Sequence, residues 1–536
     1  MMYQEPVKNE VREKSLKKAV NLLTENRHKA TIADRGYLRR VWNEININGS
    51  NEDKRLNRLL HEDTIFRWEK FYDSIALNKK PENLRVAYLC GPDPTNDLNV
   101  MIDLGILSEN VWAFEANSSS YDSATKELLT SKYPFVKLIK SDFKSFIEFS
   151  NLRFDIIYLD FCGPIYNRSG EAKNIETLAA VAKYQALNSP GVLLTNFALM
   201  SQESDPEGFK IISKLTAGYL YPKEFQDDVD SPTYINDSLT CLGIDVPGFF
   251  ELVSNDLPKY YSQFVTRLIS DIFTSIIPAD RIMNNPKMRN IFFADLMYKN
   301  KPRHILRKSI ESLFYFTQNG GGGDIFVDPG EYSFIWTLFH YLGHSSQQEL
   351  NNRLFQKHAN KFVKQLSPFS KDSNDFFEKM AAFYYLKNEN RSLQIFYSKS
   401  LKRISSNWRP FGKHVFCDVF LFHQLKDLLI RQITIPYQLN VAKSSRWQYK
   451  AKETEMFQDL FLFDECRYVY DWMPTIDMLT ENLENPGIQL SYRYILDAVS
   501  KHTRWYNNEF FSGCAVISDG VKGFNSKKFK PRETIA

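Results

Sequence analysis

The chain has 536 residues, of which 43% are hydrophobic and 25% charged, with a formal net charge of +4. This composition excludes wholesale disorder, and the length exceeds the ~250 to 300 residues at which single cores stop growing, so several domains are expected. The small net charge excludes neither a nucleic acid nor a protein as partner, because local clustering of charge matters more than the sum.

The cysteine pattern and the hydropathy indicate in which cellular compartment the protein is expected. Six cysteines without any C-x-x-C pair favour a reducing environment over a disulfide framework or a zinc finger. The segment Met1 to Lys18 is polar and charged, so it does not predict a secretory signal. No apolar run approaches the ~18 residues that a membrane-spanning helix requires. We therefore expect a cytoplasmic protein with no membrane partner, and the oligomeric state stays open.

Residues 1–80 predict a helical N-terminal region. They are rich in charge, and apolar residues such as Leu56, Leu59 and Leu60 recur at helical spacing. Pro81 then interrupts this pattern shortly before a first strand candidate. We place a domain boundary there.

Residues 81–245 predict an α/β core with a Rossmann-like, mostly parallel sheet and helices on both faces. Apolar runs with the composition of buried strands alternate with capped, helix-like segments, which is typical of βαβ units. The strand candidates are Arg85 to Gly91, Val111 to Glu115, Val136 to Asp142, Phe154 to Asp160 and Gly191 to Phe197. Ligands of such sheets bind outside the carboxyl ends of the strands.

The sheet pattern fades after Phe197, and strands that would complete a seven-stranded sheet are not evident. Residues 246–325 predict a helical extension, and residues 326–536 predict a mainly helical C-terminal domain. The run Gly320 to Gly323 near that boundary indicates a hinge or an exposed loop. It does not predict a phosphate-binding loop, because no Lys-Ser or Lys-Thr follows it.

His340 and His344 are spaced so that a helix would place both on one face, as in metal-binding pairs. The acidic residue of a zinc-peptidase motif is missing, and no other His or Cys cluster supplies further ligands. We therefore interpret the pair as part of an aromatic helix and predict no metal site.

Three acidic residues end successive strand candidates. Glu115 follows Gly91 at close to the ~20-residue spacing at which an acid binds ribose hydroxyls in dinucleotide-type sheets. Asp142 could accept a hydrogen bond from an adenine amino group, and Asp160 ends the strand beside which a transferred group would lie. A single acid at a strand end is as often a helix cap or a solvated turn. Three such acids in register favour a binding site.

Residues 82 to about 200 resemble the core of class I S-adenosylmethionine-dependent methyltransferases. The resemblance implies that the loop at Gly91 passes under the methionine part of the cofactor, that Glu115 holds the ribose and that Asp142 reaches the adenine. The motif Asp160-Phe161-Cys162-Gly163-Pro164 corresponds to the Asp-Pro-Pro-Tyr motif that meets the substrate in many members.

The first loop departs from the family pattern. It carries Pro92 and Pro94 where the family usually has further glycines, and prolines remove amide donors and stiffen the turn. Such a loop could still present the backbone of Gly91 and the carboxylates of Asp93 or Asp97 to the ammonium group of the cofactor. The helix after the loop could offer N–H groups to the cofactor carboxylate.

Asp160 is the candidate catalytic residue. If methyl transfer occurs, the sulfonium activates the methyl group, so the protein has to align the acceptor and manage one proton. Asp160 could orient an amine or accept that proton, while Phe161 or Tyr166 stacks on a planar substrate. A nucleophilic role for Cys162 is the alternative, but the proline that precedes such cysteines is absent, so an ordinary buried thiol is the default.

Several basic stretches contain or adjoin aromatic residues and predict contact with a nucleic acid, since cations bind phosphates and rings stack on bases. Solvated helix faces are the alternative interpretation. The stretches are Lys299 to Lys308, Lys402 to His414 around Trp408, Lys443 to Lys452 around Trp447 and Tyr449, and the tail Lys522 to Arg532.

Two functional hypotheses follow. The first is a methyltransferase that uses S-adenosylmethionine and acts on a nucleic acid or, as the second choice, on a protein. The second is a non-catalytic interaction protein in which a methyltransferase-like sheet is a platform or a cofactor sensor, and the prolines after Gly91 favour it. The acceptor molecule and its reacting atom are not defined by the sequence.

Overall fold

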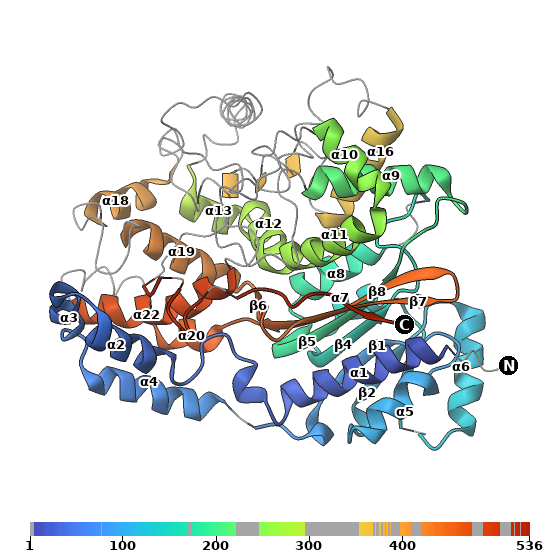
Figure 1. The fold of residues 1–536 in the computed structure, drawn as a ribbon, viewed down its shortest axis with the longest axis horizontal. Helices are drawn as coiled ribbons and strands as arrows, with labels where there is room; N and C mark the ends of the chain where they lie inside the picture. Colours follow the sequence, from blue (N-terminus) through green and yellow to red (C-terminus); the bar gives the residue numbers. More distant parts are fainter. Residues whose placement is uncertain are drawn as a thin grey trace.

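A computed structural model of the chain (Figure 1) describes three main ranges. These are residues 5–220 apart from 77, 134 and 170–172, residues 246–294, and residues 353–536 apart from 409–420, 474–485, 504–515, 519, 526 and several short segments between 368 and 396. The predicted sites Lys299 to Lys308, Gly320 to Gly323, His340 and His344 lie outside the described residues.

One sheet organises the molecule. Its strand order in the described residues is β3-β2-β1-β4-β5-β8-β7-β9, with β6 paired to β8. Strands β1 to β5 are parallel to one another, whereas β8 is antiparallel to β5 and β7. The predicted α/β, mostly parallel sheet is thus confirmed. The strands are β1 (Val86–Leu89), β2 (Val111–Phe114), β3 (Lys137–Ile139), β4 (Phe154–Asp160), β5 (Leu187–Ala198), β6 (Gln438–Leu439), β7 (Ser445–Ala451), β8 (Thr454–Asp464) and β9 (Glu533–Ile535).

Helices cover both faces of the sheet and extend beyond it at both ends of the chain, as predicted. Their bounds are α1 (Pro6–Leu23), α2 (Tyr37–Asn48), α3 (Asn51–Asn57), α4 (Glu62–Ile75), α5 (Thr95–Asp103), α6 (Ser118–Thr130), α7 (Phe143–Phe149), α8 (Asn174–Lys183), α9 (Pro206–Leu220), α10 (Val246–Asn255), α11 (Leu257–Asp271), α12 (Ile277–Asn284), α13 (Pro286–Phe292), α16 (Arg353–Leu366), α18 (Lys399–Trp408), α19 (Leu421–Thr434), α20 (Arg467–Trp472) and α22 (Pro486–Thr503). A π-helical turn, Ile272–Ile276, joins α11 to α12.

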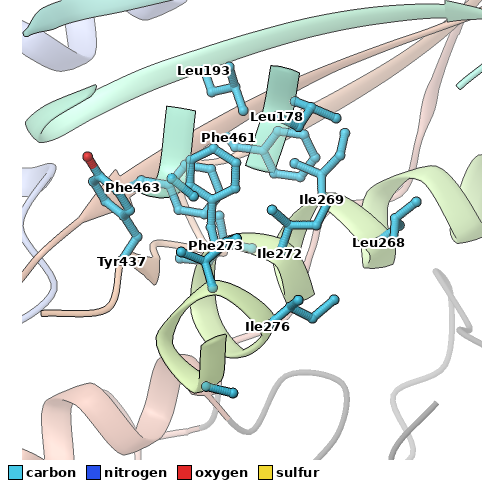
Figure 2. Packing of buried hydrophobic residues seen from close by; sticks show 14 of the residues in the cluster. Leu178, Leu193, Leu268, Ile269, Ile272, Phe273, Ile276, Tyr437, Phe461 and Phe463 are labelled. Carbon is cyan, nitrogen blue, oxygen red and sulfur yellow. The ribbon is translucent and has the colours of Figure 1, made fainter. Parts of the chain in front are cut away.

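Successive side chains of each strand enter two different hydrophobic layers, as the period of two requires. On β1, Val86 and Tyr88 belong to the layer that includes residues of α1, α5 and α6, whereas Ala87 belongs to the layer of α7, α8 and α11. Figure 2 shows part of the second layer, where Phe273 of the π-helical turn packs on the sheet. Its ring stacks on Phe463 of β8 with the ring centroids 4.4 Å apart.

The C-terminal part of the chain completes the sheet. Strand β7 leads through a tight turn into β8, and β8 pairs along β5, with Leu194 opposite Leu460. These strands fall within residues 326–536, for which the sequence predicts mainly helix. The run around β8 is buried on both faces and therefore lacks the alternation that distinguishes a strand from a helix.

The N-terminal helix α1 lies along one face of the sheet, and its apolar side, including Val11 and Leu16, is buried there. Helices α2 and α4 pack instead against α22 and α20, with Trp68 in edge contact with Trp472. None of the helices in the described ranges combines the length and the apolar character that a bilayer crossing requires.

Candidate functional site at the carboxyl ends of the strands

A cleft of about 970 Å³ lies at the carboxyl ends of β1, β2 and β4. Helix α1, the starts of α5, α7 and α8, and the turn between β7 and β8 form the remaining walls. The site residues predicted from the sequence that line this cleft are Gly91, Asp93, Asp97, Glu115, Asp142, Asp160 and Phe161.

The loop after β1 leaves its backbone accessible at Gly91. This residue has a φ of +61°, a conformation that favours glycine, and a Cβ atom built there would meet nothing within 4 Å. Pro92 is exposed at the wall of the cleft, while Pro94 is buried and precedes the first turn of α5. The N–H of Thr95 at the start of α5 donates to the Glu127 carboxylate at 3.3 Å, so the chain itself supplies an anion at this helix end.

Glu115 and Asp142 line the same cleft from neighbouring strands but differ in their local bonds. One oxygen of Glu115 accepts from the N–H of Asn117 at 2.6 Å. Asp142 caps α7, because its two oxygens accept from the N–H and the hydroxyl of Ser145 at 2.9 and 2.7 Å. Although partial burial acts in the opposite direction, the two Ser145 bonds hold the pKa of Asp142 below its usual value.

Asp160 is held by three donors from different parts of the chain. The Lys8 ammonium lies 2.8 Å from Oδ2, and Oδ1 accepts from the Asn196 amide at 2.9 Å and from the Cys162 thiol at 3.1 Å. The Asn196 amide also donates to the Tyr449 hydroxyl at 2.8 Å. The side chains of Lys8 and Asp160 are 15% and 9% exposed, so the pair is largely removed from water.

The charges of this pair stabilise each other. Burial alone would raise the pKa of Asp160, but the Lys8 ammonium and the three hydrogen bonds outweigh it and hold that pKa below its usual value. For Lys8, likewise, burial acts to lower the pKa, and the Asp160 carboxylate more than compensates and raises it. Asp160 is therefore an ionised acceptor over the physiological range.

The Cys162 thiol is a poor nucleophile at neutral pH. Loss of hydration and the neighbouring Asp160 carboxylate raise its pKa to about 12. The thiol donates to Asp160, and Lys8 donates to its sulfur at 3.4 Å. The raised pKa argues against the nucleophilic role, but the default interpretation of a buried thiol is wrong in one respect, because the Cys162 side chain is exposed.

A second ion pair lies one turn further along α1. The Arg12 Nε donates to Asp97 Oδ1 at 2.5 Å, and the two side chains are 8% and 6% exposed. Burial would lower the pKa of Arg12, but the carboxylate of Asp97 raises it instead. Sequence reasoning missed Lys8 and Arg12, although two cations four residues apart on a helix share one face, and this spacing is the signal that was available.

The two aromatic candidates occupy different places. Phe161 lines the cleft, and its ring stacks on Phe197 with centroids 5.0 Å apart. Tyr166 does not line the cleft, because it is buried beneath α16, where its hydroxyl lies 2.9 Å from Nδ1 of His358.

The fold removes the aromatic residues of one predicted nucleic-acid-binding stretch from the surface. Trp447 and Tyr449 of β7 are buried in the sheet, so their rings are not available for stacking on bases. The tail residue Glu533 accepts from the Trp447 indole at 3.0 Å, which fixes β9 beside β7. Among the residues that the structure describes, no group of three or more His, Cys, Asp or Glu side chains could hold a metal ion.

A comparison with known proteins found no protein-family model that matches this chain and no curated protein that matches its sequence.

Proposed function

We propose that the cleft binds S-adenosylmethionine and that the protein is a methyltransferase, with a nucleic acid as the first acceptor to test and a protein as the second. The carrying observation is that Gly91, Glu115, Asp142 and Asp160, which end separate strands or follow them directly, all line one cleft. Carboxyl ends of parallel strands are where such sheets bind ligands.

The residues around the cleft fit the adenosine part of this cofactor. The open space next to Gly91 allows close approach to the backbone, and the half-buried Glu115 carboxylate keeps acceptor sites for two ribose hydroxyls. Asp142 has further lone pairs besides those used to cap α7. Lys8 and Arg12 also line the cleft, but each is paired with a carboxylate of the chain, so they add no net positive charge for the cofactor carboxylate.

The bound cofactor would supply a methyl group already activated by the sulfonium charge. The ionised Asp160 would then orient an N–H or O–H of the acceptor by accepting its hydrogen bond, while Lys8 and Asn196 hold the carboxylate in place. Because the pKa of Asp160 is lowered, it is a better orienting group than proton acceptor. Phe161 would offer a ring to a planar acceptor.

One observation favours the second hypothesis, that of a cofactor sensor or platform without catalysis. Both oxygens of Asp160 already accept bonds from this chain, and its side chain is only 9% exposed. An acceptor would have to compete with Lys8 or Cys162 for this carboxylate. Cofactor binding is common to the methyltransferase and the sensor, so binding and transfer require separate tests.

Isothermal titration with S-adenosylmethionine tests binding. We expect heat from the wild-type protein and at least about tenfold weaker binding by Glu115→Ala, since a hydrogen bond to a charged group is worth ~1.5 to 3 kcal/mol. Glu109→Ala is the matched control, because Glu109 is exposed just before the opposite end of the same strand. No heat from the wild-type protein, or equal affinity of Glu115→Ala, would count against the cofactor.

Transfer of a labelled methyl group to DNA, RNA and protein extract tests catalysis. The methyltransferase hypothesis expects label in one acceptor class and its loss in Asp160→Asn, with cofactor affinity retained. Cofactor binding without transfer to any of the three would support the sensor instead.

A further inference from the structure

A second pocket, of about 620 Å³, lies far from the cleft, beyond the C-terminal end of α1. The helix has 18 residues, so its ends are about 27 Å apart at about 1.5 Å per residue. Near this end, the N–H of Ile32 donates to Asp464 at 2.9 Å, and the preceding residue of β8, Phe463, pairs with Gly191 near the amino end of β5. The pocket therefore lies at the end of the sheet opposite the cleft.

Five chain segments converge on this pocket, which we call the basic pocket. They are the stretch from the turn after α1 into the start of α2, the end of α4, the turn before β7, the end of α22 and the segment near the C-terminus. Two hydrogen bonds join them: the Asn440 amide donates to the carbonyl of Ala30 at 3.0 Å, and the N–H of Lys527 donates to the carbonyl of Lys501 at 2.7 Å.

Cations outnumber anions in the lining. Among the residues that the structure describes, the lining holds two carboxylates, and each pairs with an arginine of the same pocket: Asp34 accepts two bonds from Arg40, and Asp73 accepts one from Arg35. Four lysines line the pocket in addition, namely Lys29, Lys443, Lys501 and Lys527. The Lys501 ammonium is buried and donates to the Ile517 carbonyl, and the Lys29 ammonium donates to the Asn26 side chain at 3.0 Å. The four lysines come from four of the five segments, so the fold gathers positive charge that is dispersed along the sequence.

Charges of both signs surround the basic pocket. The Tyr37 hydroxyl donates to Asp497 at 2.7 Å, and the N–H of Ile32 donates to Asp464 at 2.9 Å. Lys18, on the last turns of α1, has its pKa lowered to about 8, first by burial and then by the positive charges of Lys530 and Lys443. His502 lines the pocket, and burial together with Lys527 lowers its pKa to about 3, so it is neutral at physiological pH. Its neutral ring can accept or donate one hydrogen bond.

We infer that the basic pocket binds a small polyphosphate, either free or as the phosphate chain of a nucleotide. Several ammonium groups around a concave site match several phosphate charges, and each contact is a charge-assisted hydrogen bond. A small ligand fits better than a nucleic acid strand because the phenol rings of Tyr37 and Tyr72 in the lining are buried and offer no platform for stacked bases.

Titration calorimetry of the full chain with sodium tripolyphosphate at low ionic strength tests this inference. We expect binding by the wild-type protein and a loss of about tenfold or more in the double variant Lys29→Ala/Lys443→Ala, because two charge-assisted contacts are removed. These lysines lie in segments distant in sequence, and Lys29 is exposed. Lys126→Ala is the control, since this exposed lysine of α6 lines neither pocket.

Further titrations distinguish a free polyphosphate from a nucleotide and test this inference independently of the proposed function. Equal affinity for tripolyphosphate and ATP would indicate a free polyphosphate, whereas tighter ATP binding would indicate a nucleotide. Unchanged affinity in the double variant, no binding by the wild-type protein, or binding of a single-stranded oligonucleotide alone would overturn the inference. Glu115→Ala should bind tripolyphosphate normally and the double variant should bind S-adenosylmethionine normally, so either proposal can fail without the other.

Discussion

The cleft and the basic pocket lie near opposite ends of α1 and differ in the balance of cations and carboxylates that line them. In the cleft, each α1 cation meets a carboxylate of the sheet edge, Lys8 with Asp160 at 2.8 Å and Arg12 with Asp97 at 2.5 Å. In the basic pocket, the lining lysines exceed the carboxylates. Pairs within the chain hold α1 on the sheet, whereas a cavity whose described lining has more cations than carboxylates favours an anionic ligand.

The largest expected effect comes from breaking a buried pair of the cleft. Arg12→Ala leaves the buried Asp97 carboxyl without its partner, and because burial already raises the pKa of Asp97, that group must either stay charged and unpaired or take up a proton. The substitution should lower the free energy of unfolding by about 3 kcal/mol. Urea unfolding measures this value. The matched control is Lys14→Ala on the same helix, whose pair with Glu533 is 42% and 49% exposed and should contribute less than about 1 kcal/mol. Equal losses in the two variants would contradict the contrast between buried and exposed pairs.

Measuring the free energy of unfolding as a function of pH tests the role of buried charge at Asp160. The lowered pKa means that the folded chain binds fewer protons than the unfolded chain, so the stabilisation is complete above about pH 4 and is lost as the pH falls through the folded value. Asp160→Asn should cost about 2 kcal/mol at neutral pH. The difference from wild type in free energy of unfolding should shrink below about pH 4. A difference that stays constant between pH 2 and pH 7 would show that the charge of Asp160 is not what matters.

Ligand binding at the two pockets should differ in its dependence on salt concentration. Raising NaCl from about 50 to about 300 mM screens exposed charges, so we expect tripolyphosphate affinity to fall about tenfold. The affinity for S-adenosylmethionine, whose ribose contacts are hydrogen bonds to Glu115, should change much less. Parallel titrations of both ligands measure this difference. Equal salt dependence would show that charge does not contribute more to binding in the basic pocket than in the cleft.

The smallest effect is expected at the loop after β1. Gly91→Ala places a Cβ at a residue with φ of +61° and should cost about 1 kcal/mol in the free energy of unfolding. The added methyl group also points into open space of the cleft, so cofactor affinity should fall as well. Gly163→Ala is the control, because its Cβ would meet only the Phe161 carbonyl oxygen at an ordinary 3.7 Å. Unfolding and titration of both variants check the prediction.

The parallel half of the sheet could be predicted because each of its strands is a short apolar run punctuated by turn residues. The runs ending at Gly91, Glu115 and Asp160 correspond to β1, β2 and β4 within one or two residues. Their order along the chain also fixed which ends share an edge, since parallel strands joined by helices end on the same side. The prediction of one shared cleft therefore needed no knowledge of distant contacts.

The remaining part of the sheet, the ion pairs of the cleft and the basic pocket depend on contacts between segments far apart in the sequence. Strand β8 joins β5 across more than 250 residues, and Asp160 is paired by Lys8 from the first helix. Likewise, the lysines of the basic pocket belong to segments that are unrelated in sequence. Local pattern specifies which residues are apolar and which are charged, because it follows the period of each element. Which charges meet, and which remain in excess, depends on the packing of distant segments, so only the tertiary structure determined it.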